Sequence, residues 1–164
     1  MRKLSYALVA LMTTLVTASI GFSAEKGSFS AKLSGGEAGP AVTTPATGKA
    51  EFELSMDGKE LTYKLTVTDI ENTTAAHIHL GVVGKDGPPL AGLFAGPRKE
   101  GKFSGVLAEG VITEKNLMGS VKDKPLSELV ELIKSGGTYV NVHTAGYPGG
   151  ELRGQIEVAP EKMY

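Results

Sequence analysis

The sequence is poor in several residue types that form common functional sites. It contains no cysteine, no tryptophan and only three histidines among 164 residues. Without cysteine the chain has no disulfide bonds, no thiolate metal ligands and no cysteine nucleophile, so its stability has to come from the packing of a hydrophobic core. The 17 basic and 18 acidic residues give a formal net charge of −1. Because this balance provides no basic stripe for phosphates, we expect no nucleic-acid partner.

Two sequence signatures of catalysis are missing as well. The Gly-Xaa-Ser-Xaa-Gly motif of serine hydrolases does not occur. No strand pattern is followed by a glycine-rich loop, a lysine and a helix, as a phosphate-binding loop requires. We therefore assign no catalytic residue.

The first 24 residues have the layout of a secretory signal peptide. Arg2 and Lys3 precede an apolar run, and small residues follow it. Three threonines interrupt the run, which argues against a retained membrane anchor. We expect a signal peptide over residues 1–24 with cleavage near Ser23 or Ala24. The mature protein is then periplasmic or extracellular, with no membrane span after signal removal.

Most of the remaining chain alternates between apolar and polar residues, which is the pattern of half-buried β-strands. Such stretches are SFSAKL, KAEFELSM, ELTYKLTV, AAHIHLGVV, LAGLFAG, KFSGVLAEGVI, TYVNVHT and ELRGQIEV. In KPLSELVELIKSGG, by contrast, Leu126, Leu129 and Ile133 recur at helical spacing. We predict an all-β fold, a Greek-key β-sandwich or barrel of about eight strands with one short helix in a crossover. Its core is predicted to contain Phe52, Leu54, Leu65, Ile78, Val140, Val142 and Ile156.

All three histidines lie in two of these predicted strands. Successive side chains of a strand point to opposite faces, so His77 and His79 point away from the side on which Ile78 is buried. The same alternation directs His143 away from Val142. We therefore expect the three histidines on the outer face of the sheet.

Two interpretations of these histidines follow from the residues. A His-Xaa-His pair on one strand and a third histidine from a neighbouring strand can offer three imidazole nitrogens to one ion, a ligand set that suits copper or zinc. Water, a carboxylate or the amino terminus would supply a fourth ligand. In the other interpretation His77, His79 and His143 are structural and hydrogen-bond loops that fold over this face.

Long stretches of the sequence resemble the CHRD domain, the module named after the chordin proteins. The resemblance rests on AAHIHLGVVGKDGPPLAGLF and GGTYVNVHTAGYPGGELRGQI, and FSAKLSGGEAGPAVTTPATGKAEFEL is similar to the opening of that domain. It covers residues 28–158. CHRD domains occur in exported bacterial and archaeal proteins and, repeated, in animal extracellular antagonists of growth factors. The resemblance implies an exported protein whose partner is an unknown extracellular or periplasmic protein or a metal ion.

The histidine motifs are also similar to those of copper-zinc superoxide dismutases, which carry His-Xaa-His on one strand of a Greek-key barrel. This resemblance implies that His77, His79 and His143 correspond to copper ligands and that Arg153, in GGELRGQ, corresponds to an anion-guiding arginine. The histidine that bridges to zinc, the other zinc ligands and the disulfide cysteines of those enzymes are absent from this sequence.

Our leading interpretation is a non-enzymatic binding module with a three-histidine copper or zinc site on the outer sheet face. One alternative is a pure protein-interaction or structural module with structural histidines. The other is a superoxide dismutase-like redox enzyme, with Arg153 as its anion-binding residue.

Overall fold

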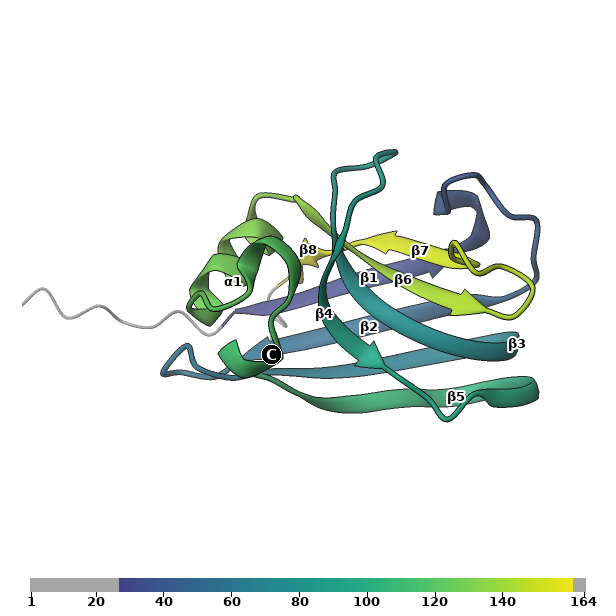
Figure 1. The fold of residues 1–164 in the computed structure, drawn as a ribbon, viewed down its shortest axis with the longest axis horizontal. Helices are drawn as coiled ribbons and strands as arrows, with labels where there is room; N and C mark the ends of the chain where they lie inside the picture. The colour runs from purple at the N-terminus through teal and green to yellow at the C-terminus, as the bar shows by residue number, and fades with distance from the viewer. Residues whose placement is uncertain (1–26, 161–164) are drawn as a thin grey trace, which may run out of the picture.

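The computed structural model describes residues 27–160, and the predicted signal peptide over residues 1–24 lies outside them. Within this part the chain forms eight strands, one α-helix and three 3-10 helices (Figure 1). The strands are β1 (Ser28–Ser34), β2 (Thr47–Leu54), β3 (Leu61–Leu80), β4 (Pro89–Phe94), β5 (Lys99–Ile112), β6 (Thr138–Thr144), β7 (Leu152–Gln155) and β8 (Glu157–Val158). The helices are α1 (Leu126–Lys134), η1 (Gly35–Glu37), η2 (Glu114–Asn116) and η3 (Gly119–Val121). The prediction of an all-β fold with one helix between two strands is confirmed.

Strand β3 closes the sheet into a barrel. Its first part pairs with β2 and β5, and its second part pairs with β4 and β6. Strand β6 then pairs with β7, β7 with β1, and β1 with β2, which returns the circuit to β3. All of these pairings are antiparallel, as expected for a barrel built from hairpins and crossovers.

The sequence pattern suggested two separate strands where the structure has the single strand β3. The residues between them continue the ladder with β5 through two register shifts instead of forming a turn. Asp69 and Asn72 lie at these shifts and have positive φ angles of 54° and 53°. Aspartate and asparagine tolerate this conformation better than other non-glycine residues, and bulges bend a strand. The bends allow the first part of β3 to pair with β2 and β5 and its second part to pair with β4 and β6.

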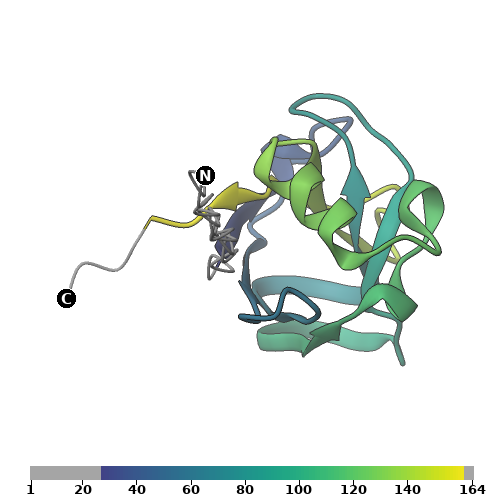
Figure 2. The same ribbon diagram turned by 90° about the vertical axis from the view of Figure 1, so that its left-hand side faces the viewer.

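The core lies between the two layers, and α1 covers one end of the barrel (Figure 2). Helix α1 buries the side chains predicted from its spacing, together with Val130. Six of the seven predicted core residues on the strands are at most 1% exposed, namely Phe52, Leu65, Ile78, Val140, Val142 and Ile156. Leu54, at the end of β2, is only partly buried. Among residues 27–160, no helix has both the length and the apolar character needed to span a membrane.

Candidate metal centre

The three histidines gather on neighbouring strands of the barrel. His77 and His79 lie on β3, and His143 lies on β6, which pairs with β3. In this pairing His143 is opposite Ala75, two residues before His77. The ring centroids are 5.6 Å apart for His77 and His79, 5.4 Å for His77 and His143, and 5.7 Å for His79 and His143. One ring nitrogen of each residue lies within 4.8 Å of the other two. We call these residues the histidine cluster.

One nitrogen of each ring is buried and has no hydrogen-bond partner. These atoms are Nδ1 of His77, Nε2 of His79 and Nε2 of His143. A buried polar atom without a partner destabilises the folded state by about 1–3 kcal/mol. Buried polar atoms are therefore nearly always partnered in proteins, and three unpartnered nitrogens in one cluster are consistent with an ion-binding site. Imidazole nitrogens bind zinc at about 2.0–2.1 Å in tetrahedral sites, which places two such ligands about 3.4 Å apart. The ligand nitrogens, which lie within 4.8 Å of one another, therefore have to approach one another by up to about 1.4 Å to share one tetrahedral ion.

Backbone carbonyls fix the tautomer of two of the histidines. Nδ1 of His79 lies 2.8 Å from the carbonyl oxygen of Gly87, and Nδ1 of His143 lies 2.9 Å from that of Pro148. A carbonyl only accepts hydrogen bonds, so each Nδ1 carries the proton and donates it. Each Nε2 is then left with a lone pair. A carbonyl behind a metal-binding histidine commonly has this effect.

Burial keeps two members of the cluster, His77 and His79, neutral. Burial, followed by the proximity of His143 and then His79, lowers the pKa of His77 to about 4. Burial also lowers the pKa of His79, although the hydrogen bond to Gly87 acts in the opposite direction. Both rings are therefore unprotonated at neutral pH, the form in which histidine binds a metal.

The face that carries the histidines is the one predicted, but it is not open. Tyr139, Asn141 and Arg153 lie on this face and are only 1%, 7% and 3% exposed. Two loops contact its side chains, residues 81–88 between β3 and β4 and residues 145–151 between β6 and β7. Figure 1 shows the course of both loops. Alternation along a strand shows which face a side chain takes, but it cannot show whether a loop covers that face.

Arg153, the predicted anion-binding residue, is engaged by the first of these loops. Its Nη1 donates to Oδ1 of Asp86 at 2.6 Å, and its Nη2 donates to the carbonyls of Val82 and Lys85 at 3.0 and 2.8 Å. Its guanidinium carbon lies 3.6 Å from the ring centroid of Tyr139. The Tyr139 ring stacks in turn on His79, with centroids 5.2 Å apart. Arg153 is thus one aromatic ring away from the cluster, and an anion-binding role for it stays a prediction.

The groups that orient the histidines could not be predicted from the sequence. Gly87 and Pro148 act through their carbonyls, which every residue has, so no side-chain pattern could reveal them. Asn141 holds the second loop, because its Nδ2 donates to the carbonyl of Gly149 at 3.0 Å. Asn141 lies on β6 opposite His77. Alternation along the strand predicts that its side chain faces outward, but it does not predict the hydrogen-bond partner.

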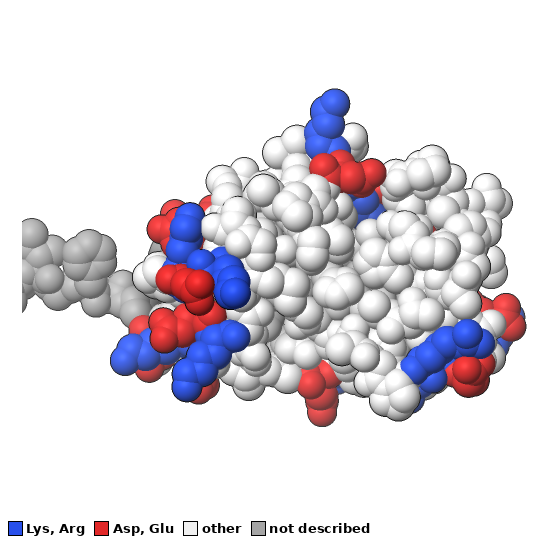
Figure 3. Space-filling view, in the orientation of Figure 1, with Lys and Arg blue, Asp and Glu red and all other residues white. Residues whose placement is uncertain are grey.

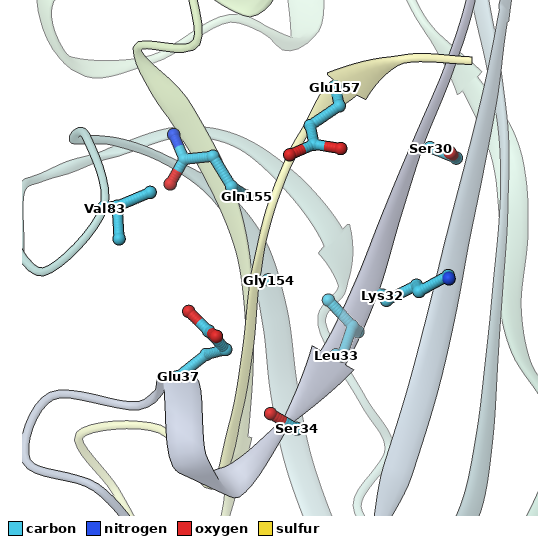
Figure 4. Close-up of a pocket in the computed structure, with 9 residues that line it drawn as sticks. All are labelled: Ser30, Lys32, Leu33, Ser34, Glu37, Val83, Gly154, Gln155 and Glu157. Atoms are coloured by element: carbon cyan, nitrogen blue, oxygen red, sulfur yellow. The ribbon is translucent and has the colours of Figure 1, made fainter. Parts of the chain in front are cut away.

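A separate pocket of about 430 Å³ lies between the outer face of β1 and strands β7 and β8. Glu37, Gln155 and Glu157 point into it (Figure 4), and none of the three histidines lines it. Across the face shown in Figure 3, basic and acidic side chains are mixed near the ends and at the top, and the wide middle is free of charge. This face offers no basic patch to a polyanion.

Comparison with known proteins gave one finding. Residues 29–156 match the family model of the CHRD domain. No curated protein and no solved structure gives a significant match. The matched range covers most of the chain and contains both histidine motifs, so the protein belongs to the CHRD domain family.

Proposed function

We propose that the protein is an exported CHRD module that binds one copper or zinc ion through the histidine cluster. The observation that carries this proposal is that each histidine places one ring nitrogen within 4.8 Å of the other two. In addition, each ring has one buried nitrogen without a partner, Nδ1 of His77 and Nε2 of His79 and His143. The carbonyls of Gly87 and Pro148 supply the supporting contacts that such ligands use. Family membership supports export, since CHRD domains are typical of extracellular proteins.

The donor set favours copper over zinc. The group contains three imidazoles and no carboxylate, and nitrogen sites bind Cu(II) more tightly than Zn(II). Three protein ligands leave a position for water or an exogenous ligand, as in catalytic rather than structural zinc sites. When bound, copper would supply a redox-active centre. The three histidines would hold the ion through their buried nitrogens, and burial would keep the rings of His77 and His79 unprotonated.

Calorimetric titration of the purified protein with Cu(II) and with Zn(II) tests the proposal. We expect one ion per chain and tighter binding of copper. Separate His77→Ala, His79→Ala and His143→Ala variants should each lose most of the affinity and still melt cooperatively. Met56→Ala is the control, because Met56 is a potential metal ligand that lies exposed outside the cluster. Unchanged copper binding in all three histidine variants would disprove the site.

A structural role for the histidines is the second candidate. The hydrogen bonds from His79 and His143 to loop carbonyls favour it, since these contacts stabilise the loops without any metal. The same titration distinguishes the two proposals, because the structural role predicts no binding by the wild type and unfolding of the histidine variants. Superoxide turnover by the copper-loaded protein is the remaining alternative, and an assay with and without copper tests it.

A further inference from the structure

The loop of residues 81–88 is fastened to the barrel by side chains of β6 and β7. At its start, Nε2 of Gln155 donates to the carbonyl of Gly81 at 2.9 Å. At its end, the backbone N–H of Gly87 donates to the hydroxyl of Tyr139 at 3.2 Å. Between them, Arg153 makes the three contacts with Val82, Lys85 and Asp86 described above. The loop thus reaches the cluster at a defined point, the Gly87 carbonyl that accepts from His79.

We infer that Arg153 is a positioning residue for His79. By holding the loop, Arg153 places the Gly87 carbonyl against Nδ1 of His79 and so keeps the Nε2 lone pair directed into the cluster. The consequence for metal binding rests on the proposed function. The effect on the His79 ring does not, because it is a property of the metal-free protein.

The geometry of Arg153 suits this role better than a role as a free cation. The side chain of Arg153 is only 4% exposed, whereas that of Asp86 is 64% exposed. An ion pair with an exposed carboxylate contributes little by itself. The guanidinium is a rigid fork with five donors, and here it spans two carbonyls and one carboxylate of the same loop. A lysine ammonium, as a point charge on a flexible stem, cannot reproduce this set of contacts.

The His79 ring is restrained from two directions, and both restraints involve Arg153. The Gly87 carbonyl contacts its edge, and the Tyr139 ring covers its face at an interplanar angle of 22°. Arg153 packs on the other side of Tyr139. His143 differs, because its carbonyl partner, Pro148, lies in the other loop. Loss of Arg153 should therefore release His79 and leave His143 as it is.

Nuclear magnetic resonance of the metal-free protein tests this difference directly. Proton–nitrogen correlations report which ring nitrogen of each isotope-labelled histidine carries the proton, and the full sequence has only three histidines to resolve. We expect Nδ1 protonation of both His79 and His143 in the wild type. In Arg153→Met, which keeps an unbranched side chain against Tyr139, His79 should show a mixture of tautomers while His143 stays unchanged. Arg98→Met is the matched control, since Arg98 forms an exposed ion pair with Glu100.

Arg153→Lys keeps the inference testable if Arg153→Met does not fold. This variant retains the positive charge but not the fork, so we expect mixed tautomers of His79 here too. A fixed His79 tautomer in either folded variant would overturn the inference, because it would show that the loop holds its place without Arg153.

Copper titration then links the inference to the metal site. Loss of a group that orients a ligand typically lowers metal affinity about 10–100-fold, and we expect a decrease of this size in Arg153→Met and none in Arg98→Met. If the wild type binds no copper, the proposed function fails but the tautomer result stands. If the wild type binds copper and His79 keeps its tautomer in Arg153→Met, the positioning role fails and the metal site stands.

Discussion

Asn141 occupies the space that a side chain at Gly150 would need. A Cβ atom at Gly150 would overlap the carboxamide of Asn141, and the φ angle of +123° at Gly150 is one that side-chain-bearing residues rarely adopt. Asn141 also holds the carbonyl of the neighbouring Gly149. The two residues therefore fix the course of the loop that brings the Pro148 carbonyl to His143.

This relationship predicts different effects for two adjacent glycines. Gly150→Ala should lower the free energy of unfolding by about 1–3 kcal/mol, because the new side chain adds a clash to a strained backbone conformation. It should also mix the tautomers of His143 and leave His79 unaffected. Gly149→Ala is the control, since nothing lies within 4 Å of its Cβ position, and its effect should stay within about 0.5 kcal/mol. Denaturant melts measure both values, and equal losses would contradict the assignment.

A second prediction concerns the barrel core. Leu65 on β3 is fully buried, whereas Thr62 on the same strand is exposed. Leu65→Ala should lower the free energy of unfolding by about 2–5 kcal/mol through lost apolar contacts and a cavity. Thr62→Ala should change it by no more than about 0.5 kcal/mol. Overlapping denaturant midpoints for the two variants would show that the faces of β3 are assigned wrongly.

The sequence predicted the faces of the strands better than it predicted their lengths. Alternation placed Ile78 and Val142 inside and the three histidines on the opposite face, because a strand permits only two directions. It did not predict that β3 is continuous, because the positive φ angles at Asp69 and Asn72 depend on pairing with β5. Alternation through the ELRGQIEV stretch places Val158 on the same face as the buried Ile156, but Val158 is 61% exposed, because the stretch divides at Ile156 into β7 and the two-residue β8.

The candidate site was predictable in its ligands and not in its surroundings. His77, His79 and His143 could be grouped because two strand patterns contain every histidine of the chain. Arg153 is buried by the loop that connects β3 to β4 and contacts Arg153 on β7. No local sequence pattern encodes the path of this loop. The same applies to the Gly87 and Pro148 carbonyls, which become recognisable only when the histidines facing them are known.

Export is a third prediction, and it concerns residues outside the described range. The charged start, the apolar run and the small residues after it predict cleavage near Ser23 or Ala24. Sequencing the amino terminus of the protein recovered from the cell envelope or the medium of a bacterial host measures this. Most molecules should begin just after one of these residues, and recovery of mostly intact Met1 would contradict export by signal cleavage.

The last prediction concerns the stability of the metal-free protein in acid. The pKa of His77 is about 4 in the folded state, whereas an unfolded histidine titrates near 6.5. Between these values the unfolded chain binds more protons, so the free energy of unfolding falls as the pH is lowered from about 6.5 to about 4. Above this window both states are neutral at His77, and below it both are protonated, so this contribution becomes constant. His79, whose pKa is also lowered by burial, acts in the same direction.

Denaturant melts across this window, in wild type and in His77→Gln, measure the contribution of His77. Glutamine is polar and does not titrate, so the variant should lose less stability between pH 7 and pH 4.5 than the wild type. The carboxylates of the chain titrate in both proteins, and their contribution cancels in the comparison. Asp57→Asn is a further control, because Asp57 is a fully exposed carboxyl outside the cluster, and it should leave the difference between wild type and His77→Gln unchanged. Equal acid sensitivity of wild type and His77→Gln would show that burial beside His143 and His79 does not hold the His77 ring neutral.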